Sequence, residues 1–255
     1  MTGDGRKLVL PNNLTPQQKR TLEAQLAQKE SKTRRKLELL IEAATLLTGK
    51  KGRGKTLSAV AISYNLRELY NIPTVCVGSK MGLKYDVYGP AAEIDERALI
   101  NELEKITDIV RAPDTELEQA LDKVLADMGV SIYGALVAVD EAYKLLESRT
   151  PSDKMVRLFG YLISQMRHYN LTLMLMAPHP DMIDKRVRRQ LDFTGRCFMN
   201  KRKQRCVVWF TGSGYTWRFR VNNADPLGLR PNYYDMYETK ALLGFRQKHL
   251  EVDEV

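Results

Sequence analysis

Residues 44–60 read ATLLTGKKGRGKTLSAV, and the segment from Gly49 to Thr56 fits the pattern G-x-x-x-x-G-K-[ST]. A short apolar stretch, expected to be a strand, leads into this segment, and residues 56–70 follow with apolar residues at helical spacing. In that setting the backbone N–H groups of the loop and of the helix N-terminus can bind phosphate groups. A Gly/Lys-rich surface loop is the alternative, which the preceding strand and the following helix disfavour.

The loop therefore predicts a nucleotide site. Lys55 is expected to bridge the β- and γ-phosphates of ATP, and the Thr56 hydroxyl is expected to ligate Mg²⁺. Lys50, Lys51 and Arg53 can add phosphate affinity or can simply be surface charge. The residues predicted to bind the nucleotide are Gly49, Lys50, Lys51, Gly52, Arg53, Gly54, Lys55, Thr56 and Leu57.

A second apolar stretch, IYGALVAVDE at 132–141, ends in two carboxylates. An acid at the end of such a strand can lie opposite the threonine of the glycine loop, so Asp140 is predicted to hold Mg²⁺ through its water shell. Glu141 is predicted to orient or deprotonate the attacking water, which hydrolysis requires. Alone, the pair could be a solvated strand end or a helix cap. Together with the glycine loop about 85 residues upstream, it predicts a hydrolytic site.

The order of elements predicts an α/β fold of the P-loop NTPase type (RecA/ASCE-like), with a mainly parallel sheet flanked by helices. Further predicted strands are 72–78 and 171–177, and further predicted helices are 94–109, 114–128, 152–169 and 180–192, with 81–90 as a loop. Segments 193–200, 205–210 and 215–221 alternate in polarity and predict antiparallel strands at the C-terminal edge, with a hairpin turn at 211–214. The aromatic residues Trp209, Trp217, Tyr215 and Phe219 are expected to form the hairpin core rather than a base-stacking surface.

Three parts are predicted along the chain: a charged helical arm at 1–43, a P-loop ATPase domain at 44–240 and a tail at 241–255. The helix of the arm is expected to run from about Pro16 to about Glu42, with Thr15 as its cap. No apolar run is long enough for an integral membrane segment, and the N-terminus has no signal-like apolar region. Three cysteines without metal-binding spacing fit reduced thiols, so a cytoplasmic location is expected, in the host cytoplasm if the protein is viral.

The net charge of +9 is unevenly distributed, since residues 185–205 hold nine basic residues and only one acid, Asp192. Such a cluster predicts contacts to the phosphates of double-stranded DNA that are salt-sensitive and independent of sequence. A solvated helix face followed by a hairpin is the alternative. The residues predicted to contact nucleic acid are Lys185, Arg186, Arg188, Arg189, Lys201, Arg202, Lys203 and Arg205.

Two segments indicate which kind of P-loop protein the chain resembles: VDEAYKLLESR (139–149) and QMRHYNLTLMLMAPHPDMID (165–184). With the glycine loop, they resemble the HerA/FtsK superfamily of DNA-translocating ATPases over residues 44–240, especially viral genome-packaging and Zot-like ATPases. Pro178 stands where that family usually carries a polar sensor glutamine. Either His179 senses the γ-phosphate instead, or it only packs in a loop between two prolines.

The resemblance implies an ATP-hydrolysing motor that handles DNA and acts as a homo-oligomeric ring. In such rings a neighbouring subunit supplies an arginine to each site, and Arg149 and Arg167 are the candidates. Alternatives are a Zot-like virion morphogenesis or extrusion ATPase and an ATP-gated DNA-binding scaffold with little turnover. A small-molecule phosphotransferase is disfavoured, because it has no use for the acidic pair or the basic segment. The N-terminal helix could dock a capsid or membrane-protein partner.

Overall fold

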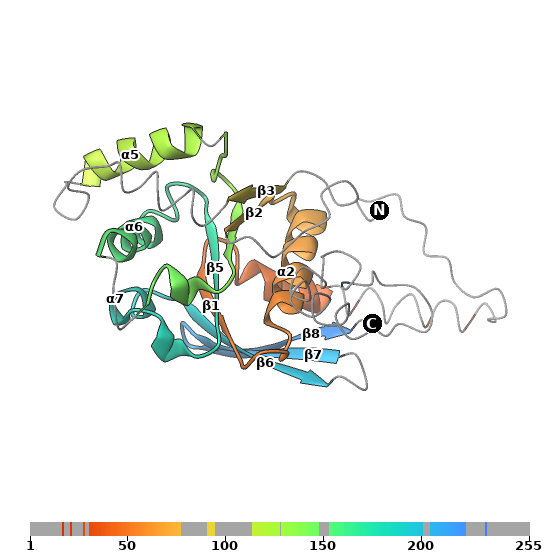
Figure 1. Cartoon of the computed structure of the whole chain (residues 1–255). Helices are drawn as coiled ribbons and strands as arrows, with labels where there is room; N and C mark the ends of the chain where they lie inside the picture. The colour runs from red at the N-terminus through yellow and green to blue at the C-terminus, as the bar shows by residue number, and fades with distance from the viewer. Residues whose placement is uncertain are drawn as a thin grey trace, which may run out of the picture.

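A computed structural model describes residues 31–77, 91–94, 114–127, 129–147, 153–200 and 205–222, together with residues 17, 21, 28 and 233. Its centre is an eight-stranded sheet with the order β3-β2-β4-β5-β1-β6-β7-β8 (Figure 1). The strands are β1 (Ala44–Thr48), β2 (Thr74–Val77), β3 (Ala91–Ile94), β4 (Leu136–Val139), β5 (Thr172–Ala177), β6 (Phe193–Asn200), β7 (Arg205–Gly212) and β8 (Tyr215–Asn222).

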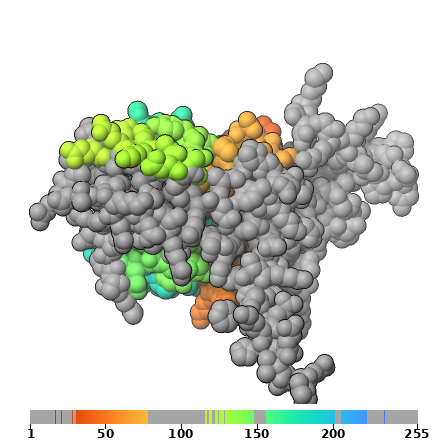
Figure 2. All heavy atoms as spheres, turned by 45° about the horizontal axis from the view of Figure 1, so that its top comes forward, coloured from red at the N-terminus to blue at the C-terminus, as the bar shows by residue number. Residues whose placement is uncertain are grey.

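Each neighbouring pair from β3 through β2, β4, β5 and β1 to β6 is parallel, and helices lie on both faces of the sheet around β4, β5 and β1 (Figure 1). Helix α2 (Lys55–Tyr70) lies on one side, while α5 (Asp114–Asp127), α6 (Asp153–Ser164) and α7 (Lys185–Arg188) lie on the other (Figure 1). In the space-filling view α5 forms part of the outer surface of that second layer (Figure 2). Strand β5 is inserted between the strand that leads into the glycine loop and the strand that ends in the acidic pair. This order confirms the predicted P-loop NTPase fold.

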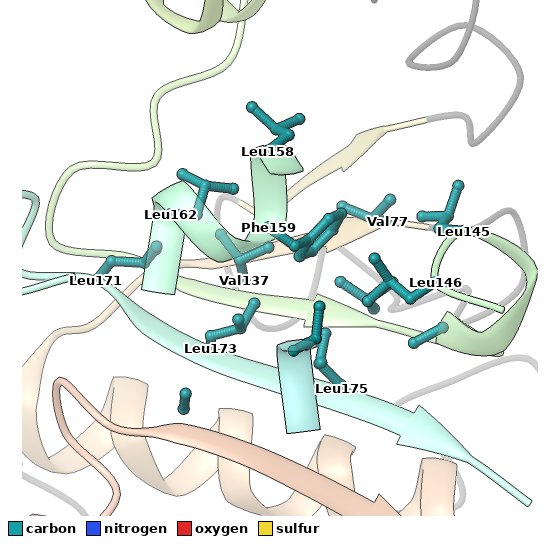
Figure 3. Packing of buried hydrophobic residues seen from close by; sticks show 14 of the residues in the cluster. Val77, Val137, Leu145, Leu146, Leu158, Phe159, Leu162, Leu171, Leu173 and Leu175 are labelled. Atoms are coloured by element: carbon teal, nitrogen blue, oxygen red, sulfur yellow. The ribbon is translucent and has the colours of Figure 1, made fainter. Parts of the chain in front are cut away.

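Side chains that alternate along β5 divide between two hydrophobic cores. Leu173 and Leu175 lie in the core that also contains Leu158, Phe159 and Leu162 of α6, and Phe159 points toward Val77 of β2 (Figure 3). Met174 and Met176 lie in the other core, under α2. The apolar run therefore forms a strand that is buried on both faces, as parallel sheets require.

Strands β6, β7 and β8 continue the sheet on the β1 side, and their mutual pairs are antiparallel. A turn at Ser213 (φ 46°) and Gly214 (φ 78°) joins β7 to β8. The antiparallel edge and its hairpin turn were both predicted from the alternating sequence. Among the described residues, these strands pack through one face, against the helix layer that contains α2.

Several predicted boundaries were wrong. β3 occupies 91–94, between the loop predicted at 81–90 and the helix predicted from 94, where no strand was predicted; it pairs in register with β2 although AAEI has little intrinsic strand preference. The remainder of the predicted 94–109 helix lies outside the described residues. The predicted 180–192 helix is a 3₁₀ turn, η2 (Pro180–Met182), followed by the four-residue α7, because the Asp184 carboxylate caps a new helix start. The predicted 152–169 helix ends at Ser164.

The described end of the N-terminal arm packs against the domain. Residues 31–38 are helical, so this helix ends before the predicted residue 42. Leu37 and Leu40 are fully buried in the core under α2. The Tyr70 hydroxyl, at the end of α2, lies 3.0 Å from a Glu38 carboxylate oxygen and 3.1 Å from the Arg34 carbonyl. Among the described residues, no helix has the length and apolar character needed to cross a membrane.

Candidate nucleotide-binding site

The glycine loop, residues 49–54, joins the end of β1 to the first turn of α2. The Gly49 N–H donates to the carbonyl of Pro178 (3.2 Å), which follows β5, and the Arg53 N–H donates to the Lys50 carbonyl (3.1 Å). The buried Lys55 ammonium donates to the Gly49 carbonyl at 2.8 Å. The loop is therefore closed on itself, with the lysine folded across it and the N-terminus of α2 directed at its interior.

Gly54 has to be a glycine for two reasons. Its φ of 88° lies in the left-handed region, and a Cβ there would stand 2.6 Å from the sulfur of Cys206 on β7. The Ser58 hydroxyl, one turn into α2, donates to the Gly54 carbonyl (2.7 Å) and lies 3.2 Å from the same sulfur. Strand β7 thus supports the loop from beneath.

The sequence analysis missed Ser58 and Cys206, because their contact joins residues 148 positions apart. Burial is the main cause that raises the pKa of the Cys206 thiol, and it raises the pKa of the neighbouring Cys197 to about 12. Both thiols therefore stay protonated at neutral pH. They act as packing groups under the loop and not as nucleophiles.

The acidic pair follows β4 directly. The Asp140 N–H donates to the Val77 carbonyl on β2 (3.0 Å), and an Asp140 carboxylate oxygen accepts from the Glu141 N–H (3.0 Å). Burial and then the Glu141 charge raise the pKa of Asp140, while the positive charges of Lys55 and Lys144 act in the opposite direction. A cation placed beside Asp140 would favour its ionised form further.

Glu141 combines a strained backbone with an unpaired carboxylate oxygen. Its φ of 48° and ψ of 42° are left-handed, a conformation that a glutamate adopts only when the surroundings impose it. Its Oε2 is buried and has no hydrogen-bond partner among the described residues. A buried acceptor without a donor is what a site waiting for a bound water or ligand would contain.

The topology brings these parts to one edge of the sheet. Thr48 pairs with Ala177, and Val139 pairs with Leu175, so the carboxyl ends of β1, β4 and β5 end together. Within the described ranges, no three His, Cys, Asp or Glu side chains gather into a metal site of their own. Mg²⁺ commonly binds one or two carboxylates together with the phosphates of a nucleotide. Thr56 and Asp140 therefore fit a shared site of that kind rather than a separate metal centre.

His179 lies at the same edge, and its imidazole is two-thirds exposed. Its Nδ1 accepts from the Asp181 N–H (3.3 Å) and so caps η2. This contact gives the histidine a structural role between its two prolines, and the sensor role stays a prediction. Pro178 contributes its carbonyl to Gly49, which a glutamine at that position could do equally well.

The two candidate arginines do not join the site within one chain. Arg167 is exposed in the turn between α6 and β5, at the amino end of β5, whereas the glycine loop lies at the carboxyl end. An arginine at that opposite edge could reach a nucleotide only in a neighbouring subunit. Arg149 lies outside the described residues.

The predicted basic cluster is divided in the structure. On α7, the Arg186 guanidinium pairs with both carboxylate oxygens of the buried Asp184 (3.1 and 3.3 Å), and Arg188 pairs with Asp181. The Arg186 hydrogen bond is the main cause that lowers the pKa of Asp184. Lys185 and Arg189 are exposed on α7, and Arg205 is exposed at the start of β7, while 201–203 lie outside the described residues. Asp181 and Asp184, just before the cluster, therefore neutralise part of its positive charge. Counting the charged residues of 185–205 alone did not include these two acids.

Comparison with known proteins identifies a family. Residues 43–240 match the family described as zonular occludens toxin (Zot). The N-terminal domain of zonular occludens toxin from Neisseria meningitidis is 18% identical, covering 78% of this chain and 100% of that chain, with a TM-score of 0.49. The genome packaging NTPase B204 from Sulfolobus turreted icosahedral virus 2, in complex with ATP-gammaS, is 13% identical, covering 69% of this chain and 96% of that chain, with a TM-score of 0.46. No curated protein matches the sequence.

Proposed function

The chain belongs to the zonular occludens toxin (Zot) family, and from this membership and the geometry of the site we propose that it hydrolyses ATP to drive the handling of DNA. The observation that carries the proposal is Glu141, whose buried carboxylate oxygen has no hydrogen-bond partner in the described part of the chain and lies at the edge where the glycine loop and Asp140 meet. Hydrolysis needs such a group to orient or deprotonate water, whereas transfer to a substrate hydroxyl does not need this acidic pair.

Each residue has a definite task in this scheme. The N–H groups of residues 49–57 hold the phosphates, and Lys55 exchanges its contact with the Gly49 carbonyl for the β- and γ-phosphates. The Thr56 hydroxyl and Asp140 hold Mg²⁺, which when bound offsets the negative charge of the phosphates. Glu141 uses its free oxygen to hold the attacking water and to accept its proton.

The finer proposal is a ring-shaped packaging or translocation motor of viral or mobile-element origin. The family resemblance of the segments around the acidic pair and Pro178 supports it, as does the net charge of +9. In this scheme Arg149 or Arg167 of one subunit completes the site of the next, and His179 senses the γ-phosphate. The basic residues Lys185 and Arg189 of α7, with 201–203, contact double-stranded DNA.

The Zot family match favours a second candidate, a virion morphogenesis or extrusion ATPase. The chemistry at the nucleotide would be the same, but ATP hydrolysis would drive a change in a capsid or membrane protein instead of the movement of DNA. The N-terminal helix, whose residues 31–38 lie against the domain, would extend from it toward such a partner.

The experiment measures ATP hydrolysis by the full chain with and without double-stranded DNA. We expect turnover that DNA stimulates, and a Glu141→Gln variant that still binds ATP but is about 10²- to 10⁴-fold slower, the usual contribution of a general base. The matched control is Glu116→Gln, the same change at an exposed position on α5. Turnover retained in Glu141→Gln would remove the hydrolytic assignment, and DNA binding without turnover would favour an ATP-gated scaffold. A particle that stays monomeric with ATP and DNA would exclude the shared site.

A further inference from the structure

The outer face of β6–β8 carries exposed side chains that have no role in the proposed ATP site. We define this outer face by the side chains that alternate with the buried ones: Thr194, Arg196, Phe198, Asn200, Arg205, Val207, Trp209, Thr211, Thr216, Arg218 and Arg220. The three strands contain four arginines, all exposed and all on this face, and no acidic residue. The opposite face, with Cys206, Val208 and Phe210, is buried under α2.

The strand register places an exposed tryptophan between two arginines. Arg196 pairs with Trp209, and Trp209 pairs with Arg218, so the three side chains form one row across the sheet. The Arg218 guanidinium lies over the Trp209 ring, 4.7 Å from its centre. In the next row, Phe198 pairs with Val207 and Val207 with Arg220, and Arg196 lies 5.4 Å from the centre of the Phe198 ring.

These aromatic rings are exposed where a hairpin core would bury them. Trp209 is 43% exposed and Phe198 is 41% exposed, while Trp217 on the buried face stacks on Phe210 at 4.1 Å. The expectation that Trp209 belongs to the hairpin core was therefore wrong, and it was also wrong for Tyr215, which is 56% exposed, whereas Phe219 is buried as predicted. A large aromatic side chain left on a surface, flanked by cations, is typical of a binding site.

We propose that the outer face of β6–β8 binds single-stranded nucleic acid, with phosphates on Arg196, Arg218 and Arg220 and a base stacked on Trp209. Arginines attract the backbone without reading its sequence, and exposed aromatic rings on a flat sheet stack bases. A duplex keeps its bases stacked inside and cannot offer one to Trp209, so this partner differs from the double-stranded DNA assigned to the motor. The inference rests on the proposed DNA-handling function and adds a second, strand-selective surface to it.

The charge of the face separates this partner from two rivals. A stable interface between two copies of the chain would be richer in apolar side chains than a face with four arginines, and two copies meeting through it would bring like charges together. An anionic membrane would also attract the arginines. However, the face's aromatic residues, Phe198 and Trp209, lie within paired strands and not on a protruding loop that could enter a bilayer.

The position of the face suggests how it relates to the ATP site. Cys206 and Trp209 belong to the same strand, β7; the first lies under the Gly54 carbonyl, and the second faces outward. The strand that would carry the nucleic acid is therefore the strand that supports the glycine loop.

Fluorescence of Trp209 tests the proposal directly. The chain has two tryptophans, so Trp217→Phe, which keeps an aromatic ring on Phe210, leaves Trp209 as the only reporter. The full-length variant is titrated with oligo(dT) of about 20 nucleotides, longer than the site of one single-strand-binding fold. Parallel titrations use oligo(rU), a duplex of equal length and vesicles containing anionic lipid. We expect a single strand to quench the Trp209 fluorescence, and we expect its affinity to fall as the salt concentration rises. Comparing oligo(dT) with oligo(rU) shows whether DNA or RNA is preferred.

Variants then locate the binding. Trp209→Ala, read out by fluorescence anisotropy of a labelled oligo(dT), is expected to weaken binding about tenfold, as loss of one stacked base does. Arg218→Glu is expected to weaken it at least as much, whereas Lys123→Glu, the same charge change at an exposed position on α5, leaves it within about twofold. Melting temperatures close to that of the parent chain verify that each variant is folded.

The remaining outcomes overturn the inference. The inference is contradicted if Arg218→Glu and Trp209→Ala bind the oligonucleotide as tightly as the parent chain, or if only vesicles quench Trp209. It is also contradicted if these variants lose oligomers of the chain and the parent chain binds no oligonucleotide. If duplex DNA stimulates ATP hydrolysis but no single strand quenches Trp209, this inference fails and the proposed function stands. If no nucleic acid binds the chain or stimulates its turnover, both fail.

Discussion

In the parallel part of the sheet, β1, β4 and β5 bury every residue, whereas β6 and β7 alternate buried and more exposed residues along their length. The difference follows from how the strands are connected. Parallel neighbours need crossover segments, and helices in those crossovers cover both faces. The antiparallel hairpins need only short turns, so among the described residues no helix packs on one of their faces.

The two parts are consequently suited to different tasks. The parallel part is closed on both faces, so chemistry is possible only at the edge where its strands end, and the glycine loop, Asp140 and Glu141 meet there. The antiparallel part has one face whose arginine and aromatic side chains are exposed. Its buried face supports the glycine loop through Cys206, which links the two parts.

The sharpest test of this comparison uses two adjacent residues of β7. Phe210 is fully buried and stacks on Trp217, so Phe210→Ala is expected to lower the free energy of unfolding by about 3–5 kcal/mol. Trp209 faces outward, so Trp209→Ala is expected to lower it by less than about 1 kcal/mol, mainly through the lost Arg218 contact. Urea unfolding of both variants measures the difference. Equal losses would mean that the outer face is covered in solution.

The support of the glycine loop by β7 predicts a smaller effect. Gly54→Ala adds a Cβ 2.6 Å from the Cys206 sulfur at a left-handed φ of 88°, and we expect a loss of about 2–4 kcal/mol together with weaker ATP binding. Gly214→Ala is the matched control, because it has a similar φ of 78° but nothing within 4 Å. It should lose only about 1–2 kcal/mol.

The double variant Gly54→Ala/Cys206→Ala isolates the contact between the two parts. Removing the sulfur gives the new methyl group space, so the double variant should be more stable than the two separate losses would predict, by about 1 kcal/mol or more. Simple additivity would show that β7 does not constrain the loop.

The sequence predicted the parallel part well, because its strands are fully apolar runs between turn signals. It missed β3, since AAEI is recruited by pairing with β2 rather than by its own preference. It also overextended the basic helix, although Pro180 and Asp184 were local signals for a turn followed by a new cap. These failures occur where pairing or a single capping side chain overrides periodicity.

The candidate site was predictable where its residues belong to a pattern. Lys55, Thr56, Asp140 and Glu141 follow from a glycine loop and an acid-tipped strand, and topology brings them to one edge. Cys206 was beyond prediction, since its role depends on a contact 148 residues away in the sequence. Trp209 was misassigned because alternation shows that β7 has two faces but not which of them is covered.

Charge pairing beside the parallel part gives the next prediction. Asp184 is 7% exposed, caps α7 and pairs with Arg186, so Asp184→Asn keeps the cap but loses about 1–2 kcal/mol at neutral pH. Its pKa in the folded state lies below the ordinary value of 3.8, so the stabilisation is complete above that value and is lost as the pH falls through the folded pKa. Denaturant unfolding of both proteins at neutral and acidic pH should therefore converge on acidification. Asp181→Asn, at an exposed position, serves as the control and should change stability by less than about 0.5 kcal/mol.

The smallest effect is expected at the boundary between the two parts, within β1. The Thr45 hydroxyl is buried and has no hydrogen-bond partner in the described ranges, so Thr45→Val should raise the free energy of unfolding by up to about 1 kcal/mol. Thr48, three residues later, donates its hydroxyl to the Gly195 carbonyl on β6 (3.2 Å), so Thr48→Val should lower it by about 1 kcal/mol. Thermal unfolding of the two variants should give shifts of opposite sign. A loss at both positions would mean that Thr45 has a partner after all, and that β1 is tied to both of its neighbours by side chains as well as by its backbone.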